Sequence, residues 1–316
     1  MDITDPRFTD ADKAREYLEA QRWPDGRICP HCGNADQTKI GALNGKAHRA
    51  GLYQCNECRE QFTVTVGSVM ERSKIPLNKW LMAMHLMGAS KKGMSAHQLH
   101  RMLGITYQSA WFLCHRIREA MGDEAPATKG GLGGTGKIVE VDEAYVGGKE
   151  SNRAHGKAAP KKAVVSLIER NGRVASFHVP NVTAKTIRPI IVKHASRASA
   201  LMTDESNLYT KLGREFASHQ SVDHSRDEYA YYDKLTDRVV SINVSENFFS
   251  ILKRGIMGVY HSVSEAHLHR YLAEFDFRYN NRSKLGVEDT ERVAKIAKGT
   301  AGKRLTYRAA SYPANG

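Results

Sequence analysis

Two closely spaced cysteine pairs constrain this chain more than any other feature of its sequence. Cys29-Pro-His-Cys32 and Cys55-Asn-Glu-Cys58 are both Cys-x-x-Cys motifs, and 22 residues separate them. Four thiolates on two tight turns supply a closed tetrahedral site for one structural Zn2+ ion. A redox-active motif is the alternative for either pair alone, but two pairs at this separation favour zinc. The sequence therefore predicts a zinc ribbon over residues 26–68, preceded by a helical segment at 1–25.

Length and charge indicate several domains and a polyanionic partner. The chain has 316 residues, enough for two or three domains, and its 47 Lys and Arg outnumber its 34 Asp and Glu for a net charge of +13. Such an excess is typical of nucleic-acid binding, and a basic solvated surface is the alternative. No apolar run reaches membrane-spanning length and the first residues do not form a secretion signal, so we expect no membrane association and a cytoplasmic, nucleoid-associated protein.

Residues 69–127 have the pattern of a helix-turn-helix. Ser95 is placed to cap one helix, Gly104 to end it and Thr106 to cap the next. Two helices joined by a short turn with glycine match the DNA-binding motif, whose second helix meets base edges at its N-terminal end. That end would carry Tyr107, Gln108 and Ser109. An ordinary helical hairpin is the alternative.

The second half of the chain changes to alternating strands and helices. Five glycines within residues 129–136 predict a flexible linker at 128–136. The expected strands are 138–146, 163–169, 174–179 and 200–203, and the expected helices are 184–195, 245–255 and 264–281. This order predicts an α/β domain over 137–282 with a mixed sheet covered by helices. Six basic and no acidic side chains at 292–308 predict a solvated basic tail within 283–316.

Three carboxylates in this domain have the placement of a metal site. Asp142 interrupts an apolar strand, Asp204 ends a short one, and Glu246 begins a helix with a buried face. Carboxylates are the ligands that Mg2+ prefers, and two such ions promote in-line displacement at phosphorus. On chemistry alone, three acids among 34 establish little.

Longer segments carry a resemblance to a known family. The cysteine pairs, the strand VEVDEAYVGGKE, the run LMTDES and the segment NVSENFFSILKRGIMGVYHSVSEAHLHRYLAEFDFRYNNR together resemble bacterial insertion-sequence transposases of the zinc-ribbon DDE type. The resemblance implies a ribonuclease-H-like catalytic domain that uses two Mg2+ ions, or Mn2+ in their place. It also implies cleavage of transposon ends, joining of 3′-hydroxyls to target DNA, and a homo-oligomer of at least two subunits on double-stranded DNA.

The resemblance also assigns residues. The three family acids fall on Asp142, Asp204 and Glu246, and the family's basic residue falls on Lys253, two helical turns after Glu246. Beside it, Arg254 is a further expected DNA contact. Basic residues that follow the Asp142 strand are expected to track phosphates. They are Lys149, Arg153, Lys161 and Lys162.

Two other functions fit the same sequence features. A zinc-dependent DNA-binding regulator would use its second half for assembly alone, and a metal-dependent nuclease would cut DNA without joining it. Cleavage and joining assays on DNA with the element's ends separate the three.

Overall fold

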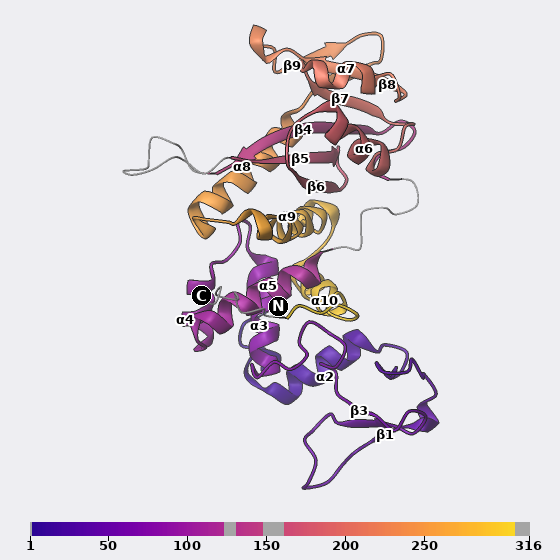
Figure 1. Cartoon of the computed structure of the whole chain (residues 1–316), viewed down its shortest axis with the longest axis vertical. Helices are drawn as coiled ribbons and strands as arrows, with labels where there is room; N and C mark the ends of the chain where they lie inside the picture. Colours follow the sequence, from indigo (N-terminus) through magenta and orange to yellow (C-terminus); the bar gives the residue numbers. More distant parts are fainter. Residues whose placement is uncertain (1, 123–130, 148–160, 307–316) are drawn as a thin grey trace, which may run out of the picture. The chain divides into compact units, whose positions relative to one another are not determined.

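The computed structural model divides the chain into two compact units (Figure 1). It describes residues 2–122, 131–147 and 161–306. The first unit comprises Met1–Ala89, Ser95–Met121 and Asp289–Gly316, and the second comprises Ser90–Met94 and Gly122–Glu288. Of the residues expected to contact DNA, Lys149 and Arg153 lie outside the described residues. No described helix has the length and hydrophobicity needed to cross a bilayer.

Helices and a small sheet form the first unit. Its helices are α1 (Pro6–Thr9), α2 (Ala11–Arg22), α3 (Leu77–Ala89), α4 (Ala96–Leu103), α5 (Tyr107–Met121) and α10 (Asp289–Lys298), with the 3-10 turn η1 (Gln37–Lys39). The antiparallel strands β1 (Ile40–Ala42), β2 (Tyr53–Cys55) and β3 (Gln61–Phe62) form the ribbon. Trp80, Leu81, Met84 and Met87, which share the predicted apolar face of α3, are all buried.

The C-terminal segment differs from the solvated tail that its basic charge predicts. Residues 289–298 form α10, which packs on α3, and its Val293, Ile296 and Ala297 are buried. Thr300 then accepts a hydrogen bond from the backbone N–H of Val69 through its carbonyl oxygen. Lys295 and Lys298 lie on the outer face of this amphipathic helix, whereas Arg292 donates to the Gly88 carbonyl of α3, and the apolar face of α10 completes the first unit.

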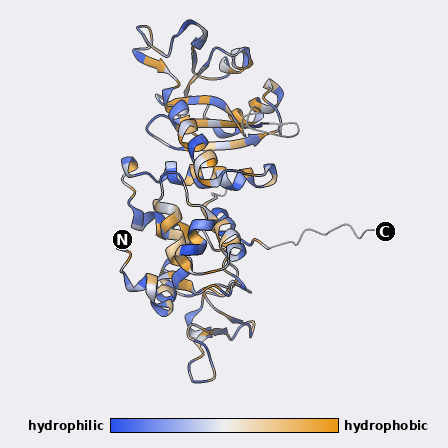
Figure 2. Ribbon diagram, turned by 90° about the vertical axis from the view of Figure 1, so that its left-hand side faces the viewer, coloured by the Kyte–Doolittle hydropathy of each residue, from blue (hydrophilic) through white to orange (hydrophobic). Residues whose placement is uncertain are grey.

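A five-stranded mixed sheet forms the centre of the second unit. The strand order is β6 (Val174–Val179), β5 (Lys162–Glu169), β4 (Ile138–Val146), β7 (Ala200–Asp204) and β8 (Ser218–Val222). The pairs β4–β5 and β5–β6 are antiparallel, whereas β4–β7 and β7–β8 are parallel. This is the mixed sheet that the sequence predicts, and Figure 2 shows hydrophobic residues along its strands.

Helices cover both faces of this sheet (Figure 1). On one face, α6 (Ala184–His194) and α7 (Asn207–Gly213) pack over Val139, Val141 and Leu201. On the other, α8 (Asn243–Gly255) and α9 (Glu265–Asn280) pack over Ala144 and Val164. The remaining elements are the hairpin β9 (Ala230–Asp233) and β10 (Arg238–Ser241), the 3-10 turns η3 (His224–Arg226) and η5 (Ser283–Leu285), and the π-turn η4 (Ile256–Tyr260).

The glycine-rich segment is not a free linker over its described residues 131–136. Leu132 is buried and pairs with Ala195, and the backbone N–H of Gly134 donates to Ser199 Oγ at 2.8 Å. Gly133 has a φ of +87°, and a Cβ there would lie 2.1 Å from Ser199 Oγ. Glycine therefore serves here for a close approach of the backbone to Ser199 within the second unit, and the prediction that this stretch is flexible is corrected over these residues.

Candidate metal centres and nucleic-acid interface

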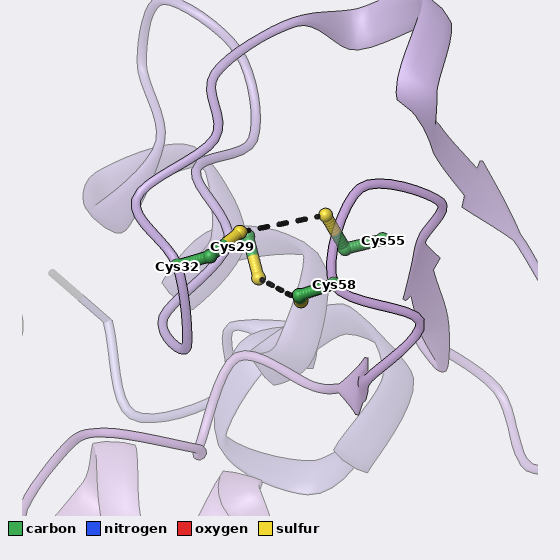
Figure 3. Close-up of side chains that lie close together, drawn as sticks. All are labelled: Cys29, Cys32, Cys55 and Cys58. Carbon is green, nitrogen blue, oxygen red and sulfur yellow. Dashed lines mark hydrogen bonds between the residues drawn. The ribbon is translucent and has the colours of Figure 1, made fainter.

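The four cysteines of the ribbon lie together (Figure 3). Their sulfur atoms all fall within 4.8 Å of one another, with Cys29 to Cys58 at 3.6 Å and Cys32 to Cys55 at 3.7 Å. All four are free thiols. This arrangement fits one structural zinc ion and favours it over two separate redox-active pairs.

The two cysteine turns have the same backbone pattern. The N–H of Gly33 donates to the carbonyl of Cys29, and the N–H of Arg59 donates equivalently to Cys55. Both Gly33 and Arg59 have positive φ, +78° and +63°. Backbone N–H of Cys58 lowers the pKa of Cys55 to about 6, and the Asn34 side chain, which donates to the same sulfur, acts in the same direction. Burial and the neighbouring thiols instead raise the pKa of Cys58 to about 12, so the bias towards the thiolate that binds metal falls on Cys55.

The helices α4 and α5 have the caps expected from the sequence. Ser95 Oγ accepts from the backbone N–H of Gln98, Gly104 ends α4 in the left-handed conformation, and Thr106 Oγ1 accepts from the N–H of Ser109. At the start of α5, Tyr107 is 44% exposed and stacks on His97 with ring centroids 4.1 Å apart. Gln108 is also exposed, whereas the Ser109 hydroxyl accepts from Thr106. Of the three expected DNA contacts, Tyr107 and Gln108 are therefore presented to solvent.

The carboxylates of the second unit lie on one face of the sheet. Asp142 follows Glu140 by two residues on β4, and Asp204 follows Met202 by two on β7, so alternation directs both aspartates to the face that packs against α8. Glu246 is in the first turn of α8. The middle of β4, the end of β7 and the first turn of α8 thus bring the three predicted acids to the same face of the sheet.

Burial and mutual repulsion perturb these groups. Burial raises the pKa of Asp142 to about 7, and the negative charges of Asp204 and Glu246 add to the rise. Burial likewise raises the pKa of Asp204. Within the described residues, neither aspartate has an ion pair; Asp142 accepts a hydrogen bond from the backbone N–H of Glu143, and Asp204 accepts one from the backbone N–H of Ser206. Half-buried acids without a cation are typical of functional sites.

The three carboxylates are less tightly grouped than the cysteine sulfurs. Over the described residues, only the four cysteines bring three or more potential ligand atoms within 4.8 Å of one another. Glu246 contributes to the looser grouping, because its side chain remains 45% exposed. The donor set still fits a hard divalent cation, since it consists of oxygen ligands on the ends of neighbouring elements.

Two residues that sequence reasoning left without a role contact acids at or next to this site, His224 on the α8 face and Tyr209 on the opposite face. The Nε2 atom of His224 is 3.7 Å from Glu246 Oε1, and the hydroxyl of the buried Tyr209 donates to Glu143. His224 begins η3, directly after β8, and Tyr209 is in α7. Their sequence separation from the acids hides both contacts, and the position of His224 after a parallel strand is the signal that could have indicated it.

The basic residues differ in their accessibility. Lys253 and Arg254 are exposed on α8, and Arg254 also donates to the Ser250 carbonyl. Lys161 is exposed, whereas the Lys162 ammonium donates to the carbonyl of Val263 at 2.6 Å. Lys161, Lys253 and Arg254 are thus the accessible members of the predicted set.

Comparison with known proteins agrees with this division of the chain. Residues 132–280 match the ISXO2-like transposase domain, and residues 9–61 match the transposase zinc-ribbon domain. The chain belongs to this transposase family. Its second unit is a transposase domain, so the family implies DNA cleavage and strand transfer. The transposase is also 24% identical over 307 residues to a protein of the transposable element ISH50 from Halobacterium salinarum, covering 92% of this chain and 98% of that protein.

Proposed function

We propose that this transposase is a DDE enzyme that cuts the ends of its element and joins their 3′-hydroxyls to target DNA. The observation that carries the proposal is the pair Asp142 and Asp204, which are half-buried on one sheet face and have no ion pair among the described residues, with Glu246 beside them on α8. A ribonuclease-H-like domain has its acids at this position of a mixed sheet, so we assign that fold to the second unit.

Asp142, Asp204 and Glu246 would hold two Mg2+ ions, or Mn2+ in their place. When bound, such ions activate the attacking oxygen and stabilise the leaving oxygen of an in-line displacement at phosphorus. The carboxylates orient this chemistry against the phosphodiester. Lys253 lies seven residues after Glu246, which places it two turns further on the same face of α8, where its ammonium would contact a phosphate.

The first unit would bind the terminal repeats. We assign α4 and α5 as a helix-turn-helix, with Tyr107 and Gln108 at the base edges and Ser109 at the helix start. Lys161 and Arg254, with Lys162, Lys149 and Arg153, would neutralise phosphates. Two ends must be held during joining, so the active form would contain at least two subunits.

The test is an assay with radiolabelled duplexes that carry the element's terminal sequences, in EDTA, Mg2+ or Mn2+. We expect strand cleavage and joining only with a metal ion. Asp142→Asn, Asp204→Asn and Glu246→Gln should each lower both rates by about a hundredfold or more while leaving DNA affinity within about threefold.

Glu265→Gln is the matched control, because it neutralises an exposed carboxylate at the start of α9 in the same unit. It should cut and join at the wild-type rate. A wild-type protein that binds the ends but neither cuts nor joins would be the regulator, and one that only cuts would be a nuclease.

A further inference from the structure

A buried carboxylate outside the proposed metal-binding set holds the start of α8. Glu140 is completely buried, and its Oε2 accepts hydrogen bonds from the backbone N–H groups of Val244 and Ser245, both at 3.0 Å. These are the second and third residues of α8, whose own N-cap residue, Ile242, provides no side-chain hydrogen bond. The first N–H groups of a helix need such acceptors, and a negative charge there is favourable. Glu140 therefore caps α8 from a neighbouring strand.

An arginine completes this contact. Arg170 Nε donates to Glu140 Oε1 at 2.6 Å, and its Nη2 donates to the Ser241 carbonyl at 2.8 Å. Its Nη1 donates to the carbonyl of Val239 at 2.7 Å. Arg170 follows β5 directly, so one guanidinium connects the sheet to β10, the strand that leads into α8. Its charge also balances that of the buried Glu140.

This arrangement lies between two of the proposed metal ligands. Glu140 precedes Asp142 by two residues on β4 and shares its face, and the helix start that Glu140 caps places Glu246 one residue after Ser245. The backbone N–H of Glu246 donates to the carbonyl oxygen of Ile242, within the same helical turn. The buried hydrogen bonds of Glu140 to the start of α8 thus fix the position of Glu246 relative to Asp142.

We propose that Glu140 and Arg170 are positioning residues that fix Glu246 relative to Asp142. The proposal rests on the proposed function for its assumption that these acids bind metal. Neither Glu140 nor Arg170 would touch the ions or DNA. They act by keeping the first turn of α8 formed and in register with β4, which presents the third carboxylate in a geometry that binds divalent cations.

The first measurement is amide hydrogen exchange of the full-length protein, followed by mass spectrometry on peptides that cover 243–249. Glu140→Gln keeps the shape of the side chain and removes its charge, and we expect exchange at the start of α8 to become about tenfold faster or more. Arg170→Lys keeps the positive charge but cannot reach all its acceptors, so it should have a smaller effect in the same direction. Exchange across β5 should keep its wild-type rate.

The second measurement is metal binding without catalysis, by titration with Mn2+ and electron paramagnetic resonance of the free ion. Glu140→Gln should weaken Mn2+ binding by about tenfold. Glu274→Gln is the matched control: Glu274 is equally buried and paired with Arg278, but on α9. It should leave both the exchange of 243–249 and the Mn2+ affinity unchanged.

Several results would overturn the positioning role. They are wild-type exchange at 243–249 in both variants, the same acceleration in Glu274→Gln, or unchanged Mn2+ binding despite a loosened α8. A wild-type protein that does not bind Mn2+ would overturn it as well. If the wild type binds Mn2+ but does not cut DNA, the proposed function fails and the positioning role is still decided by these two measurements.

Discussion

Asp142 shows how one residue links the site to stability. Its pKa is raised to about 7 by burial and by neighbouring acids, so the folded protein binds a proton there more tightly than the unfolded chain. That contribution to stability is complete below about pH 4 and is lost as the pH rises through 7. Without metal, the ionised form is therefore held at a cost in free energy at neutral pH.

Asp142→Asn should consequently stabilise the metal-free second unit at pH 8, by at most about 4 kcal/mol, and have little effect near pH 4. Calorimetry in EDTA at both pH values measures this, with the exposed Asp227→Asn as control. Equal unfolding temperatures of the wild type and Asp142→Asn at pH 8 would show that ionisation of Asp142 does not destabilise the folded protein.

The cysteine turns allow a paired test of backbone conformation. Gly33 and Arg59 occupy equivalent positive-φ positions, and a Cβ on Gly33 would meet no atom within 4 Å. Gly33→Ala should therefore cost about 1 kcal/mol through its backbone alone, and Arg59→Gly should relieve a similar strain. All three tryptophans, at 23, 80 and 111, are in the first unit, so their fluorescence in urea reports its stability. Gly41→Ala is the control, because Gly41 lies in β1 with an ordinary φ. Changes of the same sign in the free energy of unfolding for Gly33→Ala and Arg59→Gly would contradict the prediction.

At the scale of elements, local signals predicted most of the architecture. The capping residues of α4 and α5, the strands around Asp142 and the four cysteines all depend on neighbours a few residues away, and these predictions are confirmed. Glu140 was missed because its partners are about 30 and 105 residues distant in sequence. The apolar face of α10 was missed because charge dominates its composition. Which acids bind metal stays a prediction.

The glycine-rich segment provides a prediction at this scale. Gly133→Ala should lower the free energy of unfolding of the second unit by about 2 kcal/mol or more, since a Cβ would lie 2.1 Å from Ser199 Oγ. Gly134→Ala also has positive φ but meets no atom within 4 Å, so it should cost about 1 kcal/mol. Calorimetry of both variants distinguishes packing from backbone strain, and equal losses would argue against close packing at Gly133.

At the scale of the whole molecule, the first unit is built from segments that precede most of the second unit in the sequence and from one that follows it. A chain truncated after Glu288 lacks α10 and exposes the faces of α3 that α10 covers. The loss of buried Val293 and Ile296 should cost the first unit about 4 kcal/mol. Tryptophan fluorescence measures this, with truncation after Thr306 as the control that keeps α10. An unchanged urea midpoint after the shorter truncation would contradict the contribution of α10.

Because the C-terminal segment belongs to the first unit, that unit can be completed only at the end of synthesis. A ribosome completes all of the five-stranded sheet before it supplies α10, the helix that finishes the unit with the zinc ribbon and the paired helices. Products of premature termination or of a frameshift within the second unit would therefore carry an incomplete first unit. If the first unit binds the ends of the element, as proposed, we expect such fragments to compete poorly with intact copies for those ends.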